Sequence, residues 1–92
     1  MPQTVHRLTG TGPVAIGRSQ VYALWEYCYE DGDDGRPRQR RWTVRVSLDE
    51  ADGLGLFPYQ WVHLQIPGRP VVRAFYQGGR EAPPFIQLAF ER

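Results

Sequence analysis

The sequence contains no lysine, because all eleven basic side chains other than the two histidines are arginine. Arginine suits planar, bidentate recognition of phosphate or carboxylate, whereas a genomic coding bias towards arginine gives the same composition without any such role. Ten acidic residues offset the arginines and leave a formal net charge of +1. The chain therefore lacks the strong basic field that attracts nucleic acid or an anionic membrane over long distances.

Cysteine and histidine are also scarce, with one Cys and two His in 92 residues. A single cysteine forms no internal disulfide and fits a reducing compartment. A zinc site needs about four nitrogen or sulfur ligands, which three separated side chains do not supply. The sequence contains no apolar stretch near the roughly 18 to 20 residues of a membrane span, and no signal peptide is evident. We expect a cytoplasmic protein with no membrane association, no metal and no other cofactor.

The residues that catalysis requires are not grouped in the sequence. Cys28 with His63 or His6 is the one Cys–His pairing available, and nothing in the sequence brings these side chains together. Glu26 and Glu30 share one face of a predicted strand, but the predicted hairpin gives both of them arginine partners. The sequence also contains no glycine-rich phosphate-binding loop. We expect no enzyme activity and no catalytic residue.

The acidic residues Asp31, Asp33 and Asp34 have the spacing that begins a calcium-binding loop. However, Gly35 occupies the fifth position of that loop, and Trp42 stands where the bidentate glutamate should be. A solvated turn explains the segment better than a calcium site.

Aromatic residues, in contrast, are abundant: three Trp, five Tyr and four Phe can fill a core with a few large side chains. Ten glycines and eight prolines divide the chain into short segments, which is typical of all-β folds. An open sheet of this size would leave an apolar face in water. We therefore predict one all-β domain over residues 1–92, a small antiparallel barrel or folded sandwich of five or six strands with one short helical turn, in which residues 1–12 are flexible.

Alternation of apolar and polar residues locates the predicted elements. Strands are expected over 21–30, 41–48, 59–66, 71–77 and 85–90, with short runs at 4–8 and 13–16 separated by a flexible link at 9–12. In the alternating strand at 59–66, Val62, Leu64 and Ile66 face inward. Ser47 and Glu50 have the S-x-x-E spacing of a capping box and predict a helical turn over 48–52. A type II turn is expected at 67–68, and a longer loop at 78–84.

The stretch from Glu30 to Arg41 is predicted to be the tip of a central hairpin. Placing Glu30 opposite Arg41 sets Glu26 opposite Arg45, which gives two opposite-charge pairs on the outer face. The same register pairs Cys28 with Thr43, Tyr29 with Trp42, Tyr27 with Val44, Trp25 with Val46 and Ala23 with Leu48. Since a slip of one residue would exchange the two faces, we expect Glu26 and Arg45 to lie on one face of the sheet.

The segment 54–58 and the strand after it resemble a pattern of the cradle-loop barrels, in particular the AbrB-like swapped-hairpin DNA-binding proteins and the double-psi barrels. Those families often have a strand, a short polar turn or helix, then Leu-Gly-Leu-x-Pro-Gly-Asp-x-Val. The positions that match are Leu54, Gly55, Leu56, Pro58 and Val62, whereas Tyr59 and Gln60 stand where Gly-Asp is usual. The resemblance covers about Trp42 to Phe75. It implies a barrel, allows a dimer and makes DNA binding more plausible without identifying a contact residue.

The hairpin tip is a candidate nucleic-acid contact. Arg36, Arg38 and Arg40 can reach phosphates, and Trp61 and His63 on the neighbouring strand can stack against bases. Acidic residues at the tip cancel part of this charge, and without a net basic field phosphate-driven affinity is weak.

Docking to a protein partner, or to a second copy of the chain, is the rival interpretation. The chain has more aromatic residues than one small core readily holds, which indicates a contact patch. Its candidate residues are Tyr22, Leu24, Trp61 and either Phe75 or Phe85. We predict a non-catalytic module that docks on a protein or within a larger assembly, with direct DNA or RNA binding as the alternative.

Overall fold

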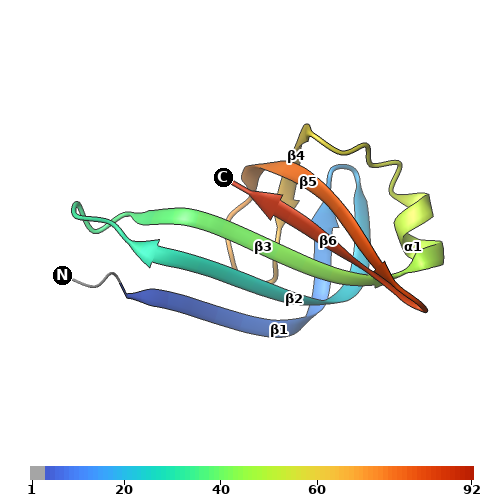
Figure 1. The fold of residues 1–92 in the computed structure, drawn as a ribbon, viewed down its shortest axis with the longest axis horizontal. Helices are drawn as coiled ribbons and strands as arrows, with labels where there is room; N and C mark the ends of the chain where they lie inside the picture. The colour runs from blue at the N-terminus through green and yellow to red at the C-terminus, as the bar shows by residue number, and fades with distance from the viewer. Residues whose placement is uncertain (1–3) are drawn as a thin grey trace.

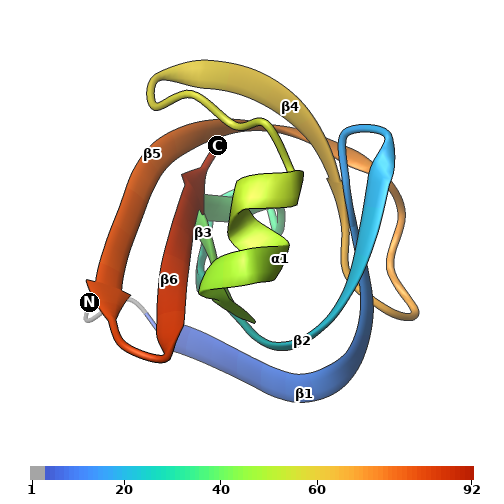
Figure 2. The ribbon, with the colours of Figure 1, turned by 90° about the vertical axis from the view of Figure 1, so that its right-hand side faces the viewer.

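The computed structural model describes residues 4–92, which form six antiparallel strands and one short helix (Figure 1). The elements are β1 (Val5–Ile16), β2 (Ser19–Asp31), β3 (Pro37–Ser47), α1 (Leu48–Gly53), β4 (Gln60–Gln65), β5 (Val72–Ala82) and β6 (Phe85–Glu91). Paired strands follow the order β1-β2-β3-β6-β5-β4, and β4 returns to β1, so that the sheet closes into a barrel (Figure 2). The predicted all-β barrel with one helical turn is confirmed.

The barrel is lopsided, because β1, β2 and β3 are longer than β4 and β6 and extend past the ring at one end (Figure 1). β1, β2 and β3 contain 12, 13 and 11 residues, whereas β4 contains six. The far ends of β1, β2 and β3 form a twisted three-stranded sheet that ends at the turn 32–36 (Figure 1). We call this part the projecting sheet. It gives the molecule its elongated outline of 43 × 24 × 22 Å.

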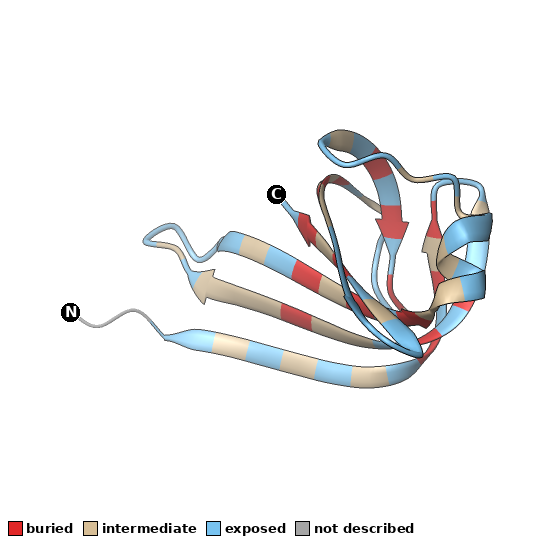
Figure 3. Ribbon diagram, turned by 45° about the vertical axis from the view of Figure 1, so that its right-hand side comes forward, coloured by how far each residue is buried: buried red, intermediate tan, exposed pale blue. Residues whose placement is uncertain are grey.

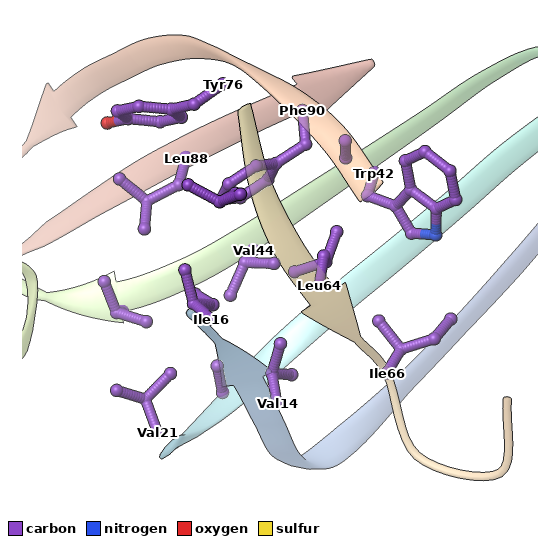
Figure 4. Packing of buried hydrophobic residues seen from close by; sticks show 14 of the residues in the cluster. Val14, Ile16, Val21, Trp42, Val44, Leu64, Ile66, Tyr76, Leu88 and Phe90 are labelled. Atoms are coloured by element: carbon purple, nitrogen blue, oxygen red, sulfur yellow. The ribbon is translucent and has the colours of Figure 1, made fainter. Parts of the chain in front are cut away.

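The inward-facing residues of the six strands form one apolar core (Figures 3 and 4). Along β4 and the residue after it, Val62, Leu64 and Ile66 are buried while Trp61 and His63 are exposed, as the alternation predicts. The buried core residues are Val14, Ile16, Val21, Ala23, Tyr27, Trp42, Val44, Val46, Val62, Leu64, Ile66, Ala74, Tyr76, Leu88 and Phe90. Helix α1 lies across one end of the barrel (Figure 2).

The local signals at the helix and at the 67–68 turn are both confirmed. Ser47 caps α1, and its Oγ accepts a hydrogen bond from the amide of Glu50 at 3.2 Å. At the turn, Gly68 has a φ of +78°, and the amide of Arg69 donates to the carbonyl of Ile66 at 3.2 Å. A glycine in this left-handed conformation closes the turn without steric cost.

The flexible link expected at residues 9–12 is instead part of β1, which pairs with β2 along its whole length. Two glycines explain the difference, because each makes room for a neighbouring side chain. A β-carbon at Gly10 would stand 2.6 Å from the Trp25 ring, and one at Gly12 would stand 2.9 Å from Pro67. These glycines admit close packing in a strand rather than breaking it. Of the predicted flexible segment 1–12, residues 1–3 lie outside the described part of the chain.

The longer loop expected at 78–84 is also wrong, because β5 continues to Ala82 and pairs with β6. A register shift between Tyr76 and Gly78, where Gly78 has a φ of +112°, carries the strand past the glycines as a bulge. A β-carbon at Gly79 would stand 2.7 Å from Ile86, so this glycine too accommodates a cross-strand side chain.

The predicted hairpin exists, but its register is wrong by two residues. Leu24 faces Arg45, and Cys28 faces Arg41, so that neither Glu26–Arg45 nor Glu30–Arg41 is a directly opposed pair. The other predicted cross-strand pairs are wrong for the same reason. Tyr27, for example, faces Trp42 rather than Val44. An even shift keeps every side chain on its predicted face, and Glu26 and Arg45 do share the outer face.

The cause of the shift lies at the tip and in the aromatic packing. Between the pairs Cys28–Arg41 and Glu30–Arg38, β3 has one more residue than β2, and Gln39 adopts a φ of +49° within this bulge. The observed register also places the rings of Tyr27 and Trp42 in a near-parallel stack, with centroids 4.9 Å apart. Glu26 instead pairs with Arg7 of β1, at 3.2 Å between carboxylate and guanidinium.

Candidate binding surfaces

The structure does not bring the predicted binding residues together. Arg36 and Arg38 belong to the tip of the projecting sheet, whereas Trp61 and His63 lie on β4, which is opposite β3 in the ring rather than beside it. Tyr22 lies on the outer face near the start of β2, facing Pro13. The prediction that the tip arginines, Trp61 and His63 form one surface is therefore wrong. The candidate residues form separate groups.

At the hairpin tip, the two exposed arginines each lie near an acidic residue of the turn. Arg36 Nε is 4.0 Å from Asp34 Oδ2, and an Arg38 guanidinium nitrogen is 3.9 Å from Asp33 Oδ2. Exposed pairs at these distances are loose, so both arginines can turn outward. Arg40 differs from them, since it is half-buried and lines a hollow together with Tyr27 and Trp42.

An exposed aromatic cluster lies on the outer face of β4 and β5. Trp61 faces Phe75 across the strand pair, with ring centroids 5.3 Å apart, and the ring of Tyr59 lies 6.3 Å from that of Phe75. Trp61 is 53% exposed and Tyr59 is 71% exposed. Arg73 lies over the Trp61 ring, 5.1 Å from its centroid. We call Tyr59, Trp61, Phe75 and Arg73 the β4–β5 aromatic patch.

The sequence alternation explains how this patch forms, although Tyr59 and Arg73 were not among the predicted binding residues. With Val62 and Leu64 in the core, Trp61 must point outward, and antiparallel pairing brings Phe75 opposite it. Tyr59 precedes β4 with a φ of +66°, and its amide donates to the carbonyl of Tyr76 at 2.7 Å. A tyrosine held in the left-handed region by this hydrogen bond was not foreseeable from the chain alone.

A second exposed patch lies on the outer face of β2, β3 and β6. Tyr22, Leu24 and Phe85 are exposed there around a hollow of about 340 Å³. Arg45, which was expected to pair with Glu26, covers Phe85 instead, with the guanidinium carbon 4.6 Å from the ring centroid. Two of the predicted docking residues, Tyr22 and Leu24, therefore do share one surface with Phe85.

The inner face of the projecting sheet carries a row of stacked rings. His6 stacks on Tyr29 at 4.8 Å, Tyr29 on Tyr27 at 5.1 Å, and Tyr27 on Trp42 at 4.9 Å between centroids. Arg69, from the segment after β4, lies over Tyr27 with 5.4 Å to the ring centroid. Burial raises the pKa of the Tyr27 hydroxyl group, and the positive charges of Arg40 and Arg69 act in the opposite direction.

Cys28 lies on the outer face of the projecting sheet, and its Sγ donates to Glu26 Oε1 at 3.1 Å. Burial raises the pKa of the Cys28 thiol, and Glu26 reinforces the increase. His6 pairs with Tyr29 in the β1–β2 ladder and therefore faces the opposite side of the sheet, where its Nε2 is 2.9 Å from Asp31 Oδ1. Cys28 and His6 thus form no Cys–His pair. Residues 4–92 contain no cluster of three or more His, Cys, Asp or Glu side chains that could hold a metal ion.

Comparisons with protein-family models, with curated proteins and with solved structures found no match to this chain. The resemblance of residues 42–75 to cradle-loop barrels finds no support in them and stays a prediction. In the part of the chain from Thr4 onward, no helix has both the length and the apolar character needed to cross a membrane. The function is therefore inferred from the four surfaces described above.

Proposed function

We propose that this protein is a non-catalytic binding module that docks onto a protein partner, or into a larger assembly, through the β4–β5 aromatic patch. The observation that carries the proposal is that Tyr59 and Trp61 both lie against Phe75 on the outside of the barrel. Single exposed apolar residues are ordinary on protein surfaces. Several aromatic side chains gathered on one strand pair are not, and such patches commonly mark interaction sites.

The chemistry of the patch favours a protein as the partner. Trp, Tyr, Phe and Arg are the residues enriched at the centres of protein interfaces, and Trp, Tyr and Arg dominate the energetic hot spots. Trp61 and Arg73 supply such a pair, and β4 and β5 hold them on a rigid sheet. Phe57, which is 72% exposed, lies two residues before Tyr59 in the chain.

Site-specific photocrosslinking in the host cell tests this proposal. A photoreactive amino acid replaces Trp61 in one variant and Tyr22 in a second, which samples the patch on β2 and β6. We expect a defined protein product from position 61 and none of that product from position 22. The partner, once purified, should bind Trp61→Ala and Phe75→Ala about tenfold or more weakly than the unsubstituted protein. Equal affinity for all three proteins would refute the assignment of this surface.

Light scattering provides the companion measurement for a second copy as the partner. If the chain forms a dimer through this patch, Trp61→Ala should be monomeric at concentrations at which the unsubstituted protein is dimeric. Crosslinking from position 61 should then join two copies of the chain.

Direct binding of DNA or RNA is the second candidate function, and one observation favours it. Arg36 and Arg38 are exposed at the end of the projecting sheet, and each is held only loosely by a neighbouring acid. Micromolar affinity for generic DNA or RNA that falls steeply with salt, and that is lost when Arg36, Arg38 and Arg40 are replaced by Ala, would establish this function in place of protein docking. We expect weak binding without that salt dependence, because acidic residues share the tip.

A further inference from the structure

The inner face of the projecting sheet meets the 66–72 segment at a hollow of about 240 Å³ that the proposed docking function does not use. Tyr27, Arg40, Trp42, Ile66 and Arg69 contribute to its walls, together with Pro37, Leu64, Pro70 and Val72. We call it the Arg40–Arg69 pocket. Figure 4 shows Trp42 and Ile66 at the same end of the core, and both residues line this pocket.

Two cationic side chains from distant parts of the chain converge on this pocket. Arg69 lies over the ring of Tyr27, and Arg40 enters from the start of β3. Both guanidinium groups are close enough to the Tyr27 hydroxyl group to lower its pKa against the larger effect of burial. The residues that line the pocket include no aspartate or glutamate. Two positive charges and one phenol therefore face the same space without an acidic side chain in its wall.

Four acidic groups at this end of the molecule have other partners. Asp31 pairs with His6 at 2.9 Å, and Asp33 and Asp34 lie beside the arginines of the tip. Glu91 accepts a hydrogen bond from Gln77 at 3.3 Å. None of the four salt bridges found within residues 4–92 involves Arg40 or Arg69. Arg40 interacts with the Tyr27 hydroxyl group, but since each guanidinium group has five N–H donors, both arginines keep donors for a ligand.

We propose that the Arg40–Arg69 pocket binds a small phosphate monoester. Two guanidinium groups match the double negative charge of a phosphate monoester better than the single charge of a carboxylate, and their planar forks suit phosphate oxygens. The apolar walls formed by Trp42, Ile66 and Val72 then receive the organic part of the ester. The volume lies below the roughly 300 Å³ at which pockets for drug-sized ligands begin, so the organic part is no larger than about one ring.

Titration with phenyl phosphate, followed by NMR, tests the proposal at neutral pH. The chain has three tryptophans, of which only Trp42 lines the pocket, so that its indole signal should report on the pocket while those of Trp25 and Trp61 report on other surfaces. We expect a saturable shift of the Trp42 signal. Binding should weaken about tenfold or more in Arg40→Gln and in Arg69→Gln. Arg18→Gln is the control, because Arg18 is exposed at the turn between β1 and β2 and does not line this pocket, and it should bind like the unsubstituted protein.

Two further ligands separate the features that the site recognises. Benzyl alcohol carries a ring without charge and should not bind, whereas inorganic phosphate carries charge without a ring and should bind more weakly than phenyl phosphate. Equal affinity for either of them would overturn the assignment of a phosphate ester. The assignment would also fail if Arg69→Gln bound phenyl phosphate as tightly as Arg18→Gln does. Arg69 is exposed, so its substitution tests the site without threatening the fold.

Discussion

Gly10 lies directly opposite Trp25 in the β1–β2 pair, where a β-carbon at position 10 would stand 2.6 Å from Cζ2 of the indole ring. The glycine thus provides the space that the Trp25 side chain occupies on the inner face of the sheet. Its backbone does not adopt a left-handed conformation, so the requirement for glycine is one of volume rather than of φ.

Gly10→Ala should therefore destabilise the fold by overpacking. We expect a loss of about 1 to 3 kcal/mol in the free energy of unfolding, because the indole ring or the strand must move. Chemical denaturation followed by tryptophan fluorescence measures the loss. Gly53→Ala is the control, since no atom lies within 4 Å of a β-carbon at that position, and it should change stability by less than about 0.5 kcal/mol. Equal stability of the two variants would contradict the packing described here.

The charge pairs of the outer face give a second prediction, which distinguishes the observed register from the expected one. Glu26 contacts Arg7 at 3.2 Å, while Arg45 lies over Phe85. A double-mutant cycle on Glu26 and Arg7 should give a coupling of about 0.2 to 1 kcal/mol at low salt, as for other exposed pairs. The same cycle on Glu26 and Arg45 should give a smaller value. A larger coupling with Arg45 would favour the register inferred from charge matching.

The features that could be predicted from sequence are those set by neighbouring residues. Alternation in 61–66 assigns the buried face of β4, and Ser47 and Gly68 mark a helix start and a turn through local hydrogen bonding and φ preference. The strands 21–30 and 41–48 were identified for the same reason. These patterns lead correctly to an all-β barrel.

The features that could not be predicted depend on residues brought together by barrel closure. Gly10 and Gly79 are typical of loops until the side chains of Trp25 and Ile86 are placed against them. The bulge at Gln39 shifts the hairpin register by an amount that charge pairing does not reveal. The position of Arg69 over Tyr27 joins residues 42 positions apart in the chain, and no local pattern indicates it.

The reactivity of Cys28 provides a third prediction. Burial raises the pKa of its thiol, Glu26 raises it further, and Arg7 lowers it. Since the thiolate is the reactive form, alkylation near pH 8 should be fastest in Glu26→Gln, slower in the unsubstituted protein and slowest in Arg7→Gln. Mass spectrometry of iodoacetamide adducts over time gives the three rates. In denaturant the three proteins should be alkylated at the same rate. Equal rates in the folded state as well would show that Glu26 and Arg7 do not act on the thiol.

Stability at alkaline pH depends on two core tyrosines, and this is the fourth prediction. Burial raises the pKa values of Tyr27 and Tyr76 above their ordinary value of 10.0. The unfolded chain therefore loses these protons at lower pH than the folded protein does. The stabilisation is complete below about pH 10 and is lost as the pH rises through the folded values, with a limiting slope of about 1.4 kcal/mol per pH unit for each group.

Replacing the two hydroxyl groups should remove this dependence while leaving the rings in the core. In a Cys28→Ser background, which eliminates the titrating thiol, the free energy of unfolding should fall between pH 9.5 and about pH 11 for the protein with both tyrosines. The Tyr27→Phe, Tyr76→Phe double variant should show a flatter profile over the same range. Urea unfolding at several pH values measures both curves. Phe preserves the stacking of position 27 on Trp42 and of position 76 on Phe90 and differs from Tyr only in lacking the titrating hydroxyl group. Parallel curves for the two proteins would therefore mean that the loss of stability at alkaline pH originates in other groups.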